Sequence, residues 1–211
     1  MNRASTVASL MLSIIAGLIS TAVGQNSTSP CTMTPVSSLS NCTTGATGLK
    51  GLGAMAFCFQ STMSCPNAKD ITFYFGYLPP GGATPIGYLP PPGGATPKGV
   101  VVLLPGAGGQ NANPEMESTF ATDYSSSPFN YQVVQLQWYQ ADWEDVNQGN
   151  NSVTQNCANS CPPNVEVAAA RPASFLNYIY TKYYQPIQQI RNNSSAGMCV
   201  QGFSGGSGAA A

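Results

Sequence analysis

GVVVLLPGAGGQ, residues 99–110, joins an uninterrupted apolar run to a glycine-rich turn. Residues 100–104 hold no polar side chain and begin with consecutive valines, which is typical of a strand buried on both faces of a sheet. Strands of this kind are most common in parallel sheets, because helices cover both faces there. The stretch therefore predicts a central strand that ends near Leu104.

The segments around this strand predict an alternation of strands and helices. Further strands are expected at residues 55–60, 71–78, 131–138 and 197–203. Helices are expected to begin at residues 113–115, with Pro114 at the first position, and to cover residues 171–184 and 204–211. Segment 171–184 has Pro172 near its start and carries one apolar helical stripe: Phe175, Leu176, Ile179, Tyr180 and Tyr183. This order predicts the α/β class, with a mostly parallel sheet flanked by helices on both faces.

The composition points to one domain, or the larger part of one, with an uncharged surface. Hydrophobic residues make up 43% of the 211 residues, which is enough to form a core. Charged residues make up only 7%, where roughly 25% is usual. The net charge is −1, and no cluster of Lys and Arg is present to bind phosphates. Nucleic acid is therefore excluded as an expected partner.

The first 24 residues have the pattern of a secretory signal peptide. Arg3 supplies the positive charge, residues 7–23 form an apolar run, and Ala22-Val23-Gly24 places small residues at the cleavage site. Cleavage is expected before Gln25, which would leave no membrane segment. The alternative is an uncleaved anchor, but the run is short for a span of about 20 residues.

Seven cysteines indicate an oxidising compartment. Residues 25–54 are rich in Ser and Thr and predict an arm tied by disulfides to the main domain, residues 55–211. Spacing suggests the pairs Cys58–Cys65 and Cys157–Cys161, although it does not fix the connectivity. A zinc site usually includes His or two C-x-x-C pairs, and the chain has neither, so we predict no metal and no cofactor. The odd count leaves one thiol without a partner in the chain.

Five asparagines begin the triplet N-x-[ST], which accepts glycans in secreted proteins. They are Asn26, Asn41, Asn150, Asn192 and Asn193. Such triplets also arise by chance in a chain rich in Asn, Ser and Thr. These residues are therefore candidate glycosylation sites whose use depends on the host.

A duplicated segment rich in proline and glycine occupies residues 76–97. GYLPPGGATP, residues 76–85, is followed by GYLPPPGGATP, residues 87–97. Proline and glycine at this density do not sustain a helix or a ladder. We interpret the repeat as a surface loop between two strands, and a polyproline ligand for another domain is the alternative.

The pattern G-x-S-x-G occurs at residues 202–206 and points to a nucleophilic serine. Ser204 follows an apolar strand and precedes a helix of small residues, as in a sharp turn that exposes the hydroxyl. Glycine is needed at 202 and 206 because strand and helix pass close together there. The amide of Gly205 can then donate to an oxyanion.

Two other places could contribute to a site. Ser207 is also flanked by glycines, but it falls one helical turn further on, where a side chain usually packs. Asp142 and Trp143 follow the strand at residues 131–138 and could line a substrate mouth at the carboxyl edge of the sheet. The alternative for these two residues is a solvated loop with a half-buried Trp.

The G-x-S-x-G pattern at residues 202–206 and the glycine-rich turn after residues 100–104 resemble motifs of the α/β-hydrolase family. The resemblance covers roughly residues 70–211. The family carries an oxyanion loop after its third strand, where this chain has Pro105-Gly106-Ala107. The match implies that Ser204 is the nucleophile and that the amides of Ala107 and Gly205 bind the oxyanion. It also implies an acid and then a His after the nucleophile. The chain contains no His, so we expect the N-terminal part of a longer α/β-hydrolase domain, and a naturally truncated homologue is the alternative.

The sequence thus predicts a secreted serine hydrolase that acts on an ester or a related acyl bond. A small molecule or a polymer carrying that ester would be its partner. A non-catalytic extracellular module that uses the same fold for binding or adhesion is the second hypothesis.

Overall fold

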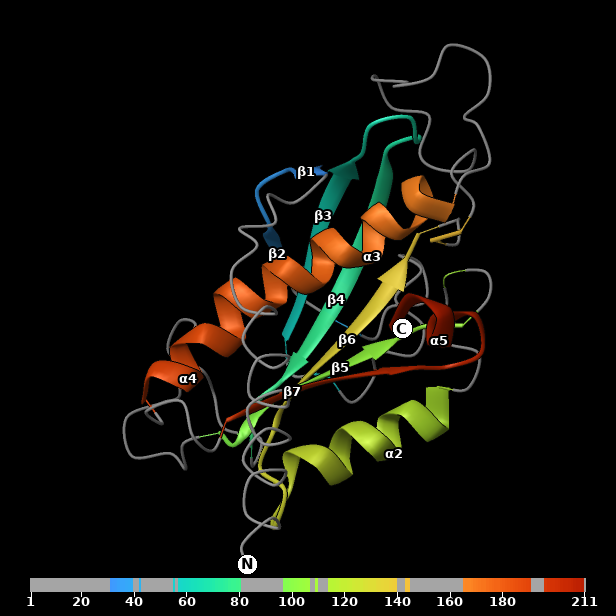
Figure 1. The fold of residues 1–211 in the computed structure, drawn as a ribbon. Helices are drawn as coiled ribbons and strands as arrows, with labels where there is room; N and C mark the ends of the chain where they lie inside the picture. The colour runs from blue at the N-terminus through green and yellow to red at the C-terminus, as the bar shows by residue number, and fades with distance from the viewer. Residues whose placement is uncertain are drawn as a thin grey trace, which may run out of the picture.

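The computed structural model describes residues 31–39, 42, 55, 57–80, 97–106, 109, 114–139, 143–144, 165–190 and 196–210. The strands are β1 (Thr32–Met33), β2 (Ser37–Leu39), β3 (Phe57–Ser64), β4 (Ile71–Leu78), β5 (Gly99–Leu104), β6 (Gln132–Trp138) and β7 (Gly197–Gly202). The helices are α2 (Pro114–Ser125), α3 (Val165–Ile179), the π-helical turn η4 (Tyr180–Tyr184), α4 (Gln185–Ile190) and α5 (Gly205–Ala210). The described strands form one curled sheet in the order β1-β3-β4-β6-β5-β7, with β2 also paired to β3 (Figure 1).

The predicted fold class is wrong, because the sheet is mixed and is not a mostly parallel α/β-hydrolase sheet. β1 and β2 pair antiparallel with β3, β3 pairs antiparallel with β4, and β4 pairs antiparallel with β6. Only the ladders β5–β6 and β5–β7 are parallel. The connections explain the difference. The short turn of residues 65–70 can join β3 to β4 only as a hairpin, since a parallel pair needs a crossover of a dozen or more residues.

Several element boundaries also differ from the predicted ones. The strand expected at residues 55–60 is β3, which begins at Phe57 and continues to Ser64. Residues 76–78, which we assigned to the repeat loop, belong to β4, and the repeat residues 81–96 lie outside the described part of the chain. The strand at 71–78 and the helix start at Pro114 are confirmed.

The long helices pack on opposite faces of the sheet. α3, η4 and α4 follow one another without a break and cross in front of β3 and β4 in Figure 1. Phe175 and Ile179 of α3 are fully buried on Phe73, Val134 and their neighbours on this face. Ala121 of α2 is buried in a second core cluster, on the face that carries Val101, Leu103 and Val133. The sheet is therefore apolar on both faces, as the valine run of β5 indicates.

The stripe predicted on segment 171–184 is buried only in part, because the helix has a different start and a π-turn. α3 begins at Val165, so Pro172 lies inside the helix and not near its start. Phe175, Ile179 and Tyr183 are buried, whereas Tyr180 is exposed. At η4 the amide of Gln185 donates to the carbonyl of Tyr180. Pro186 follows directly and has no amide to donate, which accounts for the wider turn at this point.

Two disulfides join the N-terminal segment to β3: Cys31–Cys65 and Cys42–Cys58. The predicted pair Cys58–Cys65 is wrong, since these residues lie at opposite ends of the eight-residue strand β3 and a bridge needs α-carbons within about 7 Å. Register explains the observed pairs. Thr32 faces Ser64 and Leu39 faces Cys58, so Cys31 and Cys42 come beside their partners. Residues 157 and 161 lie outside the described residues.

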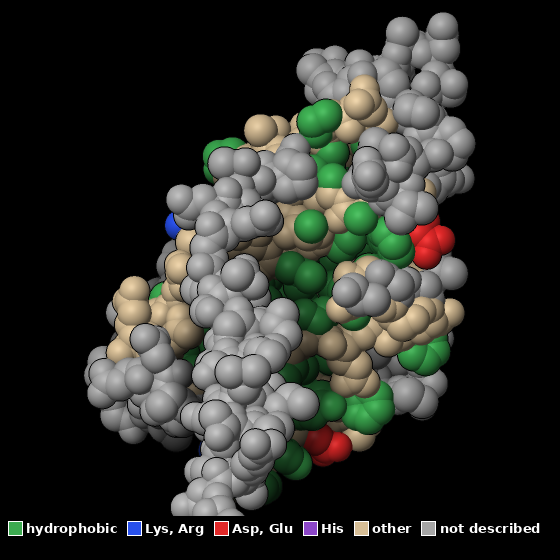
Figure 2. Space-filling model, in the orientation of Figure 1, with side chains coloured by type: hydrophobic (Ala, Val, Ile, Leu, Met, Phe, Trp, Pro, Cys, Tyr) green, Lys and Arg blue, Asp and Glu red, His purple; other side chains and the backbone are tan. Residues whose placement is uncertain are grey.

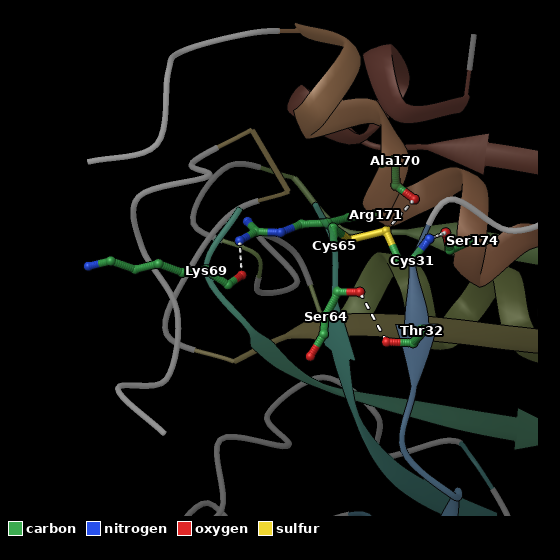
Figure 3. Close-up of a disulfide and its surroundings, with 8 residues drawn as sticks. All are labelled: Cys31, Thr32, Ser64, Cys65, Lys69, Ala170, Arg171 and Ser174. Atoms are coloured by element: carbon green, nitrogen blue, oxygen red, sulfur yellow. Dashed lines mark hydrogen bonds between the residues drawn. A yellow bond between two sulfur atoms is a disulfide. The ribbon is translucent and has the colours of Figure 1, made fainter. Parts of the chain in front are cut away.

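The surroundings of Cys31–Cys65 tie the arm to α3 as well (Figure 3). The amide of Cys31 donates to the hydroxyl of Ser174 over 3.2 Å. Arg171 is fully buried, and its guanidinium donates over 2.8 Å to the carbonyl of Lys69 in the turn between β3 and β4. One end of the sheet is thus joined to the N-terminal segment by a covalent bond, and hydrogen bonds from Cys31 and from Arg171 fix this end to α3.

The visible face of the molecule matches its composition. Hydrophobic side chains gather along the middle of the face in Figure 2, and charged side chains are few. Among the described helices, none is long and apolar enough to cross a bilayer. The disulfides indicate folding in an oxidising compartment.

Candidate functional site

Ser204 stands in the turn between β7 and α5, as the G-x-S-x-G pattern predicts. Its φ angle is 49°, in the left-handed region that is rare for residues other than glycine. The residue is exposed. A non-glycine residue held in this conformation stores backbone strain, which is frequent where a side chain must project into a functional site. The geometry is therefore that of a strained strand-to-helix turn that carries an exposed serine.

Backbone hydrogen bonds hold the turn from both sides. The amide of Phe203 donates to the carbonyl of Leu104 over 3.2 Å, which extends the β5–β7 ladder beyond the end of β7. The amide of Gly206 donates to the carbonyl of Phe203 over 2.8 Å, and the amide of Ser207 to the carbonyl of Ser204 over 2.9 Å. Ser204 is thus the one residue between a strand still in register and a helix already begun.

The two outer glycines of the motif are required by packing. A Cβ atom on Gly202 would collide with the carbonyl group of Gly206. A Cβ atom on Gly206 would collide with the backbone of Pro105 and lie 2.8 Å from the carbonyl oxygen of Leu104. Helix α5 therefore passes directly over the ends of β7 and β5, and any side chain at these positions would force the turn apart.

The glycine-rich turn after β5 reaches the same place. A Cβ atom on Gly106 would lie 3.1 Å from Cδ1 of Phe203, 3.2 Å from the carbonyl oxygen of Phe203 and 3.4 Å from Cβ of Ser204. β5 and β7 are parallel neighbours, so their carboxyl ends meet at one edge of the sheet. The structure thus brings together the two motifs that sequence analysis singled out separately. Ala107 itself lies outside the described residues.

Ser207 occupies a different environment. It lies within α5 and is exposed, and its hydroxyl donates to the carbonyl of Ser204 over 2.5 Å. This local bond holds the Ser207 side chain against its own helix. Ser204 therefore lies in the strained turn and Ser207 in the helix, as expected, but the Ser207 side chain is exposed and not packed.

Trp143 lies in the core and not at an open mouth. Only 7% of its surface is exposed, and its neighbours belong to the cluster formed with Trp138 and Phe175. Asp142 lies outside the described residues. Neither residue is part of the site that we describe. The five candidate glycosylation asparagines also lie outside the described residues.

Sequence analysis missed Phe203, the residue before Ser204. It is 37% exposed, and its ring lies beside Gly106. The sequence does carry a signal for it: the second residue of the G-x-S-x-G pattern is a phenylalanine, which places an apolar side chain in the turn that exposes the serine. Cys199 lies within β7, is exposed and is the described cysteine outside the disulfides.

Comparison of the chain with models of protein families, with curated proteins and with solved structures gave no significant match. The interpretation of the site therefore stands on its own geometry.

Proposed function

We propose that this chain carries the nucleophile of a secreted serine hydrolase that cleaves an ester or a related acyl bond. One observation carries the proposal. Ser204 has a left-handed backbone in a strand-to-helix turn, and the glycine-rich turn after β5 lies against it at Gly106. An exposed serine in strained geometry next to a second loop of backbone amides is the arrangement that acyl transfer needs.

The proposed reaction has two halves. The Ser204 oxygen bonds to the acyl carbon while its proton passes to a general base, and the carbonyl π electrons move onto the carbonyl oxygen. The amides of Gly205 and Ala107 are the proposed donors to that oxyanion. The alcohol then leaves with a proton, and water repeats the sequence to release the acid and the free serine.

The general base is not assigned to a residue of this chain. The 211 residues contain no histidine, and neighbouring carboxylates are absent from the described part of the turn. The similarity of the two motifs to those of the α/β-hydrolase family supports an acid and a His that act on Ser204. The alternative is a non-catalytic extracellular binding module.

The proposed location rests on two features. The first 24 residues have the pattern of a signal peptide, and the described N-terminal segment is closed by two disulfides.

A fluorophosphonate probe tests the activity. It bonds to a serine only where a base and an oxyanion hole act together. For the protein expressed from its complete gene, we expect labelling at Ser204, located by peptide mass spectrometry. Ser204→Ala should abolish the labelling, and the matched variant Ser207→Ala should retain most of it. Absence of labelling in a folded protein would favour the binding module.

A further inference from the structure

Phe203 differs from the other exposed aromatic side chains of the described structure. Among the described residues, three large hydrophobic side chains are exposed: Phe129 at 48%, Tyr180 at 38% and Phe203 at 37%. The ring of Phe129 packs against Tyr124, and the ring of Tyr180 packs against Tyr184. No aromatic ring among the described residues pairs with Phe203. Phe203 is therefore the one of these three rings that has no aromatic partner among the described residues.

The position of this ring is fixed by the site. Phe203 immediately precedes Ser204, and its amide is bonded to the carbonyl of Leu104. Its Cδ1 atom lies beside Gly106, which has no side chain to cover the ring. The ring thus stands between the turn that bears the nucleophile and the turn proposed to supply an oxyanion amide. The ring is thus an exposed neighbour of Ser204 that a substrate bound at the serine would be able to contact.

We propose that Phe203 is a specificity-determining residue that contacts an aromatic group next to the scissile carbonyl of the substrate. This inference rests on the proposed function of Ser204. Aromatic rings pack on one another in stacked or edge-to-face geometry and gain more than their buried area alone gives. The low charge of the chain, 7% charged residues, fits an uncharged aromatic group better than an acidic or basic one. The substrate class is therefore an ester of an aromatic carboxylic acid.

Two boronic acids separate this inference from the proposed function. A serine oxygen adds to the trigonal boron of phenylboronic or methylboronic acid while its proton passes to the base, and no bond to boron is broken. The two probes share this step and differ only in the group that would meet Phe203. The measurement is the ratio of their dissociation constants for the protein expressed from its complete gene, with adduct formation at Ser204 followed by ¹¹B NMR.

We expect the protein to prefer phenylboronic acid, and Phe203→Ala to lower that preference roughly fivefold or more. Phe203→Leu keeps an apolar side chain and removes the ring, so it should also lower the preference. Phe203→Tyr should retain it. Phe129→Ala is the matched control, because it removes an exposed phenylalanine from the segment between α2 and β6; it should leave the ratio unchanged.

The outcomes are distinct. If both acids add to Ser204 but the ratio is the same in Phe203→Ala and Phe203→Leu, the role of Phe203 is overturned and the proposed function stands. If neither acid adds, and Ser204→Ala behaves like the unchanged protein, the proposed function is overturned together with the inference that rests on it.

Discussion

Gly106 lies against Ser204: a Cβ atom built on the glycine would be 3.4 Å from Cβ of the serine. The two residues are far apart in sequence and meet because β5 and β7 are parallel neighbours whose carboxyl ends share one edge. The absence of a side chain at Gly106 leaves room for the turn that holds Ser204. This contact is the part of the structure on which the proposed chemistry depends most.

Gly106→Ala should reduce the reactivity of Ser204 and leave the fold nearly intact. The new methyl group would lie closer to Phe203 than side chains normally approach, so the turn must shift by a few tenths of an ångström. Because small displacements at a reacting centre lower rates steeply, we expect fluorophosphonate labelling to slow by roughly tenfold or more. The second-order rate constant of labelling is the measurement. Labelling at the unchanged rate would show that the turn after β5 does not support the nucleophile.

Gly202→Ala should destabilise the protein, because its methyl group would collide with the backbone of α5. Overpacking of this kind costs about 1 to 3 kcal/mol, and here the colliding atoms are backbone and cannot rotate away. The matched control is Gly197→Ala in the same strand, where the nearest atom to the new Cβ would be the Tyr131 hydroxyl at 3.9 Å. Urea unfolding of both variants measures the difference. Equal stabilities would contradict the close packing of β7 and α5.

Peptide mapping under non-reducing conditions should find Cys31 joined to Cys65 and Cys42 joined to Cys58. Replacing both cysteines of either pair by Ala should lower the free energy of unfolding by about 3 to 4 kcal/mol. The sequence separation is 34 for Cys31–Cys65 and 16 for Cys42–Cys58. Because the longer loop loses more entropy on closure, removal of Cys31–Cys65 should cost slightly more. A peptide that joins Cys58 to Cys65 would show that the register of β3 is different.

Tyr77 should make the protein lose stability in alkaline solution. Burial raises the pKa of its phenol well above the ordinary value of about 10. Above pH about 10 the folded state therefore keeps a proton that the unfolded state releases. The stability that the protonated phenol contributes is intact below pH about 10 and is lost as pH rises further. At pH 11, the variant Tyr77→Phe should lose about 1 kcal/mol less free energy of unfolding than the unchanged protein.

Urea unfolding at pH 8 and pH 11 tests this expectation. Tyr180→Phe is the control, because Tyr180 is exposed and Tyr77 is only 5% exposed. If the two variants lose stability equally between these pH values, the phenol of Tyr77 is not buried in the way described.

Local sequence patterns predicted the backbone around Ser204 better than they predicted the sheet. The G-x-S-x-G pattern placed Ser204 between a strand and a helix, because glycine at 202 and 206 is a strong local requirement. The direction of β4 was mispredicted, because an apolar run looks the same in a parallel and in an antiparallel ladder. Only the short turn before β4 distinguishes the two cases.

Other features depended on partners that are distant in sequence. The start of α3 at Val165 was missed because Pro172 is usually found in the first turn of a helix, whereas here the burial of Phe175 and Ile179 outweighs the lost hydrogen bond. The disulfides were mispaired because spacing does not reveal the register of Leu39 on Cys58. The contact of Phe203 with Gly106 likewise requires the β5–β7 pairing.

The position of Ser204 directly after β7 has a consequence for the stability of the proposed site. Among the described strands, β7 pairs with β5 alone, whereas β4, β5 and β6 each have a partner on both sides. A local opening that separates β7 from β5 would take Ser204 away from Gly106 while the remaining ladders stay intact. The contact between Ser204 and Gly106 is therefore protected only by the free energy of this partial opening, which is smaller than the free energy of global unfolding. We therefore expect heating to disturb the turn at Ser204, at the edge of the described sheet, before it exposes the hydrophobic core to water.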